Sequence, residues 1–146
     1  MPRAHVDTTV LFAAGYRRDG ANSKARPILR GIDDGSLPEA VVLDYVLAET
    51  LNGLTAHAGH DAAVDFLGRI EENRRFYVDS LTTDAFATAK DLFRRHRPFS
   101  FVDAAIVSHI EATDGTYVYA FDDDFEAADG VRRLATATNP FDPGGA

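Results

Sequence analysis

The spacing of apolar residues along the chain predicts strands that alternate with helices. Residues 4–12 are apolar and β-branched, which indicates a strand that runs into a short helix. Residues 40–43 form a wholly apolar run, as in a parallel strand that is buried on both faces. Apolar residues then recur at helical spacing over residues 47–54, which predicts a helix that Asp44 caps and Gly59 ends.

The rest of the chain continues this alternation. It contains predicted helices at 23–34, after Asp61, from Thr82 or Thr83 to Arg95, and from Ser100 to about Ala112, and predicted strands at 75–78, 116–121 and 131–134. The alternation is typical of an α/β fold, and we expect a three-layer sandwich with a mostly parallel central sheet. We also expect one domain over residues 1–138 and a flexible C-terminal tail over residues 139–146.

The apolar residues of two predicted helices indicate which of their faces turn inward. In the helix after Asp61, Val64 and Leu67 are predicted to face the core. Ile70 either faces the core with them or forms an exposed patch with Phe66, which lies four residues before it. Such a patch would support a homodimer, and the alternative is that all four residues are buried. In the helix that ends at Arg95, the residues predicted to face inward are Ala85, Ala89, Leu92 and Phe93.

Composition excludes several classes of protein. The 146 residues contain no cysteine, which excludes disulfides, thiolate zinc sites and cysteine nucleophiles. No run of 18 apolar residues is present, and the apolar N-terminal stretch is interrupted at Asp7 and lacks the features of a signal peptide. We therefore expect a cytoplasmic protein without a membrane segment.

The net charge of −8 bears on the choice of partner. Proteins that bind nucleic acids are usually basic, because phosphate contacts dominate their affinity. An acidic chain is compatible with such binding when part of its charge is concentrated in a carboxylate metal site. The basic residues are almost all arginine, which fits a salt-rich environment and GC-rich codon usage equally well.

Three acidic residues have apolar neighbours in the predicted elements. Asp7 lies in or just past the first strand, where an ionised carboxylate is unfavourable unless it is paired, binds a metal or caps the next helix. Asp103 begins an apolar helical stripe, and alternatively it forms a capping box with Ser100. Glu49 lies on a helix and shares a face with Asn52. For each acid, the alternative is an ordinary structural or solvated charge.

A run of three acids, Asp122, Asp123 and Asp124, follows the strand predicted at 116–121. Their charges repel one another unless water or a cation screens them. Side-chain alternation would place Asp122 and Asp124 on one side and Asp123 on the other. Because ligands in such folds gather at the carboxyl ends of strands, these distant acids are predicted to converge there. Oxygen ligands of this kind suit Mg²⁺ or Mn²⁺.

Two other kinds of site are weaker alternatives. A zinc site from His57 and His60 with His96 or His109 is disfavoured, because the first two flank the end of a predicted helix. An aspartyl-phosphate phosphatase requires a second Asp two residues after the first, and Thr9 stands there instead.

Four segments, in order, resemble the motifs of the PIN-domain family. They are VDTTVL with Asp7, ETLNGL with Glu49 and Asn52, SFVDAAIVSH with Asp103, and YAFDDDF with Asp122. The resemblance covers nearly the whole chain. Within the family, this compact single-domain chain is similar to VapC-type toxins of toxin–antitoxin pairs. Ala120 stands where the family often has Thr or Ser, which leaves open whether Asp122 or Asp124 is the main fourth ligand.

The resemblance implies a magnesium- or manganese-dependent endoribonuclease that cuts single-stranded RNA, forms a homodimer and is inhibited by an antitoxin protein. It implies a catalytic and metal-binding set of Asp7, Glu49, Asp103 and Asp122, with Asp124 as a further metal ligand and Thr9 and Asn52 in support. The alternative is a PIN-like scaffold that binds RNA or protein without cutting. The candidate RNA contacts are Arg17, Arg18, Arg94, Arg95 and Arg97.

Overall fold

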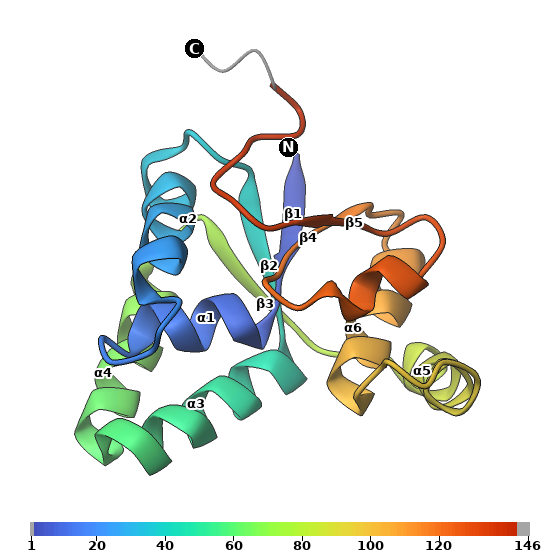
Figure 1. The fold of residues 1–146 in the computed structure, drawn as a ribbon, viewed down its shortest axis with the longest axis horizontal. Helices are drawn as coiled ribbons and strands as arrows, with labels where there is room; N and C mark the ends of the chain where they lie inside the picture. The colour runs from blue at the N-terminus through green and yellow to red at the C-terminus, as the bar shows by residue number, and fades with distance from the viewer. Residues whose placement is uncertain (1, 143–146) are drawn as a thin grey trace.

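The computed structural model describes residues 2–142 and contains a central sheet of five parallel strands (Figure 1). The strands are β1 (Arg3–Val6), β2 (Glu39–Leu43), β3 (Phe76–Asp79), β4 (Tyr117–Tyr119) and β5 (Arg132–Leu134). Their order across the sheet is β3-β2-β1-β4-β5, and every neighbouring pair is parallel. The predicted α/β class with a parallel sheet is therefore confirmed.

Helices cover the sheet on both sides, which completes the three layers. The helices are α1 (Thr8–Gly15), α2 (Asn22–Asp34), α3 (Asp44–Ala58), α4 (His60–Glu72), α5 (Thr83–Arg95) and α6 (Phe101–Ala112), and a 3₁₀ helix η1 spans Asp123–Ala127. Figure 1 shows α1 to α4 on one side of the sheet and α5 with α6 on the other. None of the helices in residues 2–142 combines the length and apolar character needed to span a lipid bilayer.

The strand order reverses at β1, and this reversal positions the site. From β1 the chain adds β2 and β3 on one side, and later it adds β4 and β5 on the other. The carboxyl ends of β1 and β4 are adjacent, with Val6 paired to Tyr119. The backbone N–H of Asp7 extends this pairing by donating to the carbonyl of Tyr119 at 2.9 Å. In open α/β sheets, a switch in strand order of this kind is where ligands bind.

The core follows the apolar pattern of β2 and α6. All of β2 is buried, as expected for a strand covered by helices on both faces. In α6 every residue from Asp103 to Ile110 is buried.

Two buried histidines connect β1 to α6. Nε2 of His5 in β1 lies 2.7 Å from Nδ1 of His109 in α6, and the two atoms share a hydrogen bond. Burial and then the neighbouring His109 lower the pKa of His5 to about 3, so the His5 ring is neutral.

Two predicted helix starts need correction. Asp44 is the first residue of α3 rather than its cap, and its carboxylate accepts the N–H of Leu81 at 3.3 Å, which ties α3 to the segment after β3. Asp61 lies in the first turn of α4 and does not cap it, because α4 begins at His60. Gly59 separates the two helices with a φ of 99°, a conformation that favours glycine over other residues.

The predicted orientation of two helices was partly wrong. Val64 is 52% exposed, whereas Phe66 and Ile70 are buried, so the predicted Phe66–Ile70 surface patch does not exist. The inner face of α4 carries Ala63, Phe66 and Ile70, and Gly15 leaves room for the Phe66 ring, since a Cβ there would lie 3.0 Å from it. In α5, the inward residues Ala85, Ala89 and Leu92 are confirmed, but Phe93 is 47% exposed.

The first part of the predicted tail contacts the domain. The Asn139 amide donates to the carbonyl of Ser36 at 3.1 Å, and the ring of Phe141 lies 5.2 Å from that of Tyr117. Residues 143–146 lie outside the described part of the chain. The division into a domain over residues 1–138 and a flexible tail over residues 139–146 therefore stays a prediction.

Candidate metal centre

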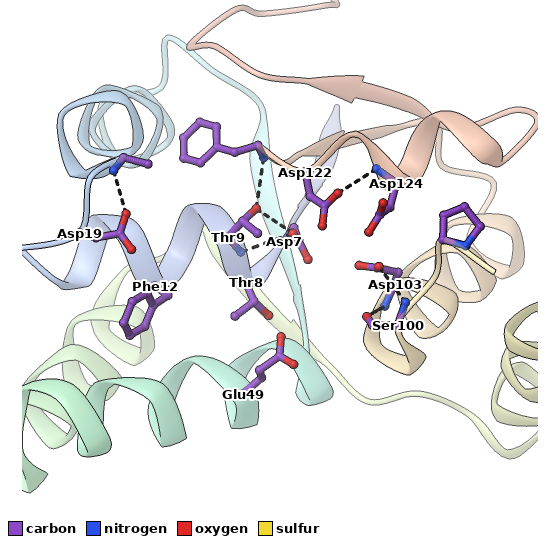
Figure 2. A pocket seen from close by; sticks show the side chains of 13 residues that line it. Asp7, Thr8, Thr9, Phe12, Asp19, Glu49, Ser100, Asp103, Asp122 and Asp124 are labelled. Carbon is purple, nitrogen blue, oxygen red and sulfur yellow. Dashed lines mark hydrogen bonds between the residues drawn. The ribbon is translucent and has the colours of Figure 1, made fainter. Parts of the chain in front are cut away.

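A cavity of about 490 Å³ opens at the carboxyl ends of β1 and β4 (Figure 2). It is lined by Asp7, Thr8, Thr9, Phe12, Asp19, Ala21, Glu49, Pro98, Ser100, Asp103, Phe121, Asp122 and Asp124. All five acids predicted from the sequence are among these residues. Among the described residues that line the cavity, none is Lys, Arg or His, so no protein cation balances the carboxylates there.

Asp7 caps a helix and also lines the cavity, so the helix-cap and metal-site interpretations of this residue are compatible. Strand β1 ends at Val6, so Asp7 does not lie inside the strand; it is the N-cap of α1. Its Oδ2 accepts a hydrogen bond from the Thr9 hydroxyl at 2.8 Å. Asp7 is only 3% exposed, and burial raises the pKa of its carboxyl to about 6 despite the Thr9 hydrogen bond, with a further contribution from the charge of Asp103. A buried carboxylate with a raised pKa gains most from a bound cation.

The hydroxyl of Thr9 joins the first predicted acid to the chain beyond β4. Its Oγ1 donates to Asp7 and accepts the backbone N–H of Phe121 at 3.1 Å. Thr8, which was not among the residues predicted for the site, also lines the cavity, and its buried Oγ1 has no hydrogen-bond partner among the described residues. Its only signal in the sequence was a second hydroxyl beside Asp7.

Asp103 is held by a capping box at the start of α6. Its backbone N–H donates to Ser100 Oγ at 3.1 Å, and its Oδ2 accepts the backbone N–H of Ser100 at 3.0 Å. The capping and site interpretations are compatible, because Oδ1 accepts no hydrogen bond within residues 2–142. Burial raises the pKa of Asp103, and the charges of Asp122 and Glu49 add to the rise, while the bonds with Ser100 oppose it.

Asp122 and Asp124 face the cavity from the turn after β4. Asp122 caps η1 by accepting the N–H of Asp124 at 2.9 Å. Both carboxylates line the cavity, whereas Asp123 is exposed and does not. The expected sides are therefore right, although a capped 3₁₀ turn, not strand alternation, produces them. Partial burial and the neighbouring Asp122 carboxylate raise the pKa of Asp124.

Three of these acids form a compact group. Asp103, Asp122 and Asp124 each offer one carboxylate oxygen, and these oxygens lie within 4.8 Å of one another (Figure 2). Charges of one sign at this separation repel strongly unless protons or a cation neutralise them. Oxygen donors alone suit Mg²⁺ or Mn²⁺ better than softer metals. The acidic cluster is consistent with a metal site of the PIN-domain type.

Glu49 and Asn52 are placed differently from each other. Glu49 is exposed on α3 and lines the cavity, where Figure 2 shows it below Thr8 and apart from Asp103 and Asp124. Asn52 is exposed and does not line the cavity, so the structure does not show the supporting contact expected from the sequence. The roles of all these residues stay predictions.

The histidines do not assemble the alternative zinc site. His109 is buried and hydrogen-bonds His5, and the His57 ring packs against Phe12 with 5.6 Å between ring centroids. Within residues 2–142, the metal-ligand group with converging donor atoms contains carboxylates only.

Comparison with solved structures finds VapC toxins and toxin–antitoxin complexes. Mycobacterium tuberculosis VapC20, described as a toxin that cleaves the sarcin–ricin loop, is 29% identical with a TM-score of 0.75, over 88% of this chain and 96% of VapC20. A Klebsiella pneumoniae toxin–antitoxin complex shares 17% identity, with a TM-score of 0.61 over 88% and 95% of the two chains. Rickettsia felis VapBC2, bound to a promoter DNA fragment, shares 12% identity, with a TM-score of 0.69 over 91% and 98%.

The family itself is shown by the sequence match. No curated protein matches the sequence significantly. The model of the PIN domain, however, matches residues 4–131, which include the four resembling motifs and every acid of the cavity. The predicted resemblance to the PIN-domain family and to VapC toxins is therefore confirmed. The chain belongs to the PIN-domain family.

Proposed function

We propose that this chain is a metal-dependent endoribonuclease that cleaves single-stranded segments of RNA as the toxin of a toxin–antitoxin pair. The observation that carries the proposal is the convergence of Asp103, Asp122 and Asp124 within 4.8 Å, in a cavity that Asp7 and Glu49 also line. PIN domains are typically metal-dependent nucleases, and the similarity to VapC20 extends over most of both chains.

The residues of the cavity would divide the work of phosphodiester hydrolysis. Asp103, Asp122 and Asp124 would hold Mg²⁺ or Mn²⁺, together with Asp7 and, at the outer side, Glu49. A bound ion of this kind lowers the pKa of water and neutralises the charge that develops on the phosphate. Thr9 keeps Asp7 oriented, and Ser100 keeps Asp103 oriented, so neither carboxylate has to be ordered when RNA binds.

Cleavage by purified protein tests this proposal. RNA oligonucleotides, one with the sequence of a sarcin–ricin loop and one unstructured, are incubated with the chain and Mg²⁺, Mn²⁺ or EDTA, and the cut ends are mapped. Metal-dependent cuts at unpaired positions are expected. Binding of RNA without cleavage under any of the metal conditions would favour the alternative, a PIN-like scaffold, over a nuclease.

An antitoxin protein is the partner that we propose for the cavity. The homologous K. pneumoniae and R. felis structures are toxin–antitoxin assemblies. The described lining of the cavity contains six acidic residues and no basic residue, so an Arg or Lys from a partner would be attracted to it in place of a metal ion. Co-expression with the product of the adjacent gene should abolish RNA cleavage, and persistent cleavage by the saturated complex would exclude this mode of inhibition.

The remaining expectations from the sequence stay proposals. A homodimer does not use the predicted Phe66–Ile70 patch, since both residues are buried. The exposed apolar side chains that remain available to a second copy include Val64, Val78 and Phe93. Light scattering at high micromolar concentration tests the dimer, which a strictly monomeric mass would exclude. A cytoplasmic location also remains proposed.

A further inference from the structure

Three rings pack together beside the acidic cavity. Phe12 comes from α1, Tyr16 directly follows α1 as its C-cap, and His57 comes from α3. Their ring centroids lie 5.5 Å (Phe12–Tyr16), 5.6 Å (Phe12–His57) and 5.7 Å (Tyr16–His57) apart. We call these three residues the aromatic platform. Phe12 also lines the cavity, on the side away from Asp103 and Asp124 (Figure 2). The platform is therefore continuous with the candidate metal centre.

The platform is held in place but open to solvent. Phe12 and Tyr16 are half-buried and His57 is exposed, so the rings are not fully covered by the core. The Phe12 ring packs closely against Gly53 of α3, because a Cβ at this position would lie 3.0 Å from two atoms of the ring. A glycine inside a helix is destabilising relative to alanine, and the close approach of Phe12 accounts for its presence. The Phe12 ring therefore packs directly against α3.

The chemistry of this side of the cavity favours a base over a phosphate. Exposed aromatic rings and histidine stack on unpaired nucleobases, whose flat faces match theirs. Asp19 lines the cavity on the same side as Phe12 (Figure 2), and its carboxylate repels a phosphate there. Arg17 and Arg18, the candidate phosphate contacts, are exposed and do not line the cavity. The opposite side, with its converging carboxylates, would attract a phosphate only through a bound cation. The two sides are therefore complementary to two different parts of one nucleotide strand.

We propose that Phe12, Tyr16 and His57 stack on an unpaired base close to the scissile phosphate, and so position the RNA strand over the acidic cluster. This inference rests on the proposed function as a ribonuclease, and the feature of the substrate that the site would recognise is an unpaired base. The platform residues are positioning residues, because they contact a base and not the reacting phosphate. Stacking requires a base that is free of its helix, so the platform selects single-stranded or looped RNA.

Binding to RNA with and without bases tests the platform. The variants Phe12→Leu and His57→Ala are made in an Asp103→Asn chain, which is expected to hold RNA without cutting it. Affinity is measured for an RNA that carries a fluorescent 2-aminopurine, and for a series in which one base at a time is replaced by an abasic site. The platform variants should bind intact RNA roughly 5- to 150-fold more weakly than the Asp103→Asn parent, because stacking is lost. For the RNA that lacks the base over the platform, the variants and the parent should bind with equal affinity.

Matched variants separate stacking from general effects. Phe12→Tyr keeps the ring and should retain affinity. Phe141→Leu removes another exposed ring, which is 49% exposed and does not line the cavity, and should change nothing. His57→Ala alters an exposed side chain, so it tests the platform even if Phe12→Leu is unstable.

The possible failures are distinguishable. If the Asp103→Asn parent binds RNA and the platform variants bind it equally well, the platform is overturned and the nuclease proposal stands. The platform is also overturned, and the nuclease proposal also stands, if the variants lower the affinity for intact and for abasic RNA by equal factors. If the parent does not bind RNA and the unmodified chain does not cut it, the proposed function fails and the platform fails with it.

Discussion

The hydroxyl of Thr9 accepts the backbone N–H of Phe121 at 3.1 Å, across 112 positions of sequence. The same oxygen donates to Asp7, so one side chain fixes both the first acid and the turn that presents Asp122 and Asp124. Thr9 thereby links the two strand ends on which the candidate metal centre is built.

Replacement of Thr9 tests this link. Thr9→Val keeps the branched shape but leaves the amide of Phe121 without its acceptor, and it leaves Asp7 Oδ2 with only the longer bond of 3.4 Å from the backbone N–H of residue 9. A buried group that loses its hydrogen bond costs about 1–3 kcal/mol, and we expect a loss of stability of this size together with weaker Mn²⁺ binding. Denaturant unfolding and metal titration measure the two effects. Thr9→Ser retains the hydroxyl and should restore both, whereas equal behaviour of the two variants would show that the hydroxyl is unimportant.

Neutral replacement of the buried acids should abolish cleavage without unfolding the chain. In Asp7→Asn and Asp103→Asn, we expect cleavage to fall by more than about 100-fold, since even residues that only support metal ligands typically contribute 10- to 100-fold. Thermal unfolding without metal should be unchanged or shifted upward, because one repelling charge is removed. Asp123→Asn, in the same acidic run but outside the cavity, is the control and should remain active. Full activity in Asp7→Asn or Asp103→Asn would overturn the assignment of that residue.

The stability of the metal-free protein should depend on pH through Asp7. The pKa of this carboxyl rises from 3.8 to about 6 on folding, so the folded chain binds the proton more tightly than the unfolded chain. Its contribution to stability is therefore present below about pH 4 and is lost as pH rises through about 6, with an upper limit of ~3 kcal/mol. The difference in unfolding free energy between the natural chain and Asp7→Asn, measured from pH 4 to 8, isolates this effect. A difference that does not vary with pH would contradict it.

The capping box of α6 should contribute to both stability and the metal centre. Ser100→Ala removes the acceptor for the N–H of Asp103, which should cost about 1 kcal/mol and weaken Mn²⁺ binding. Thr82→Ala is the matched control, since Thr82 caps α5 through the N–H of Ala85 and does not line the cavity. It should lose similar stability while leaving metal affinity unchanged. Equal losses of metal affinity in both variants would mean that Ser100 does not position Asp103.

Arginine should provide the electrostatic part of RNA binding. Arg17 and Arg18 are exposed, whereas Arg94 already pairs with Asp91 at 3.1 Å. For a single strand, each lost phosphate contact reduces the slope of log affinity against log salt by about 0.7. The double variant Arg17→Gln and Arg18→Gln should lower this slope, and Arg69→Gln, which removes a partner of Asp65, should not. An unchanged slope in the double variant would exclude these two residues as phosphate contacts.

The sequence predicted the sheet and the acids that line the candidate metal centre because their signals are local. The apolar run at 40–43 is β2, and the order of strands and helices implied a parallel sheet before any contact was known. The capping box of Ser100 and Asp103 was visible from a spacing of three residues. Acids among apolar neighbours stood out, because burial of an unpaired charge is unfavourable and therefore rare.

What the sequence did not determine depends on packing between distant segments. The buried face of α4 was assigned wrongly in part, at Val64, since this face depends on where Gly15 of α1 makes room for Phe66. The grouping of Asp103 with Asp122 and Asp124 follows from where the start of α6 meets the turn after β4. The exposed place of Asn52 and the approach of Phe12 to His57 follow from how α1 and α3 meet. Apolar periodicity specifies which residues must be buried, and only the tertiary structure decides which partners bury them, because many pairings satisfy the same local pattern.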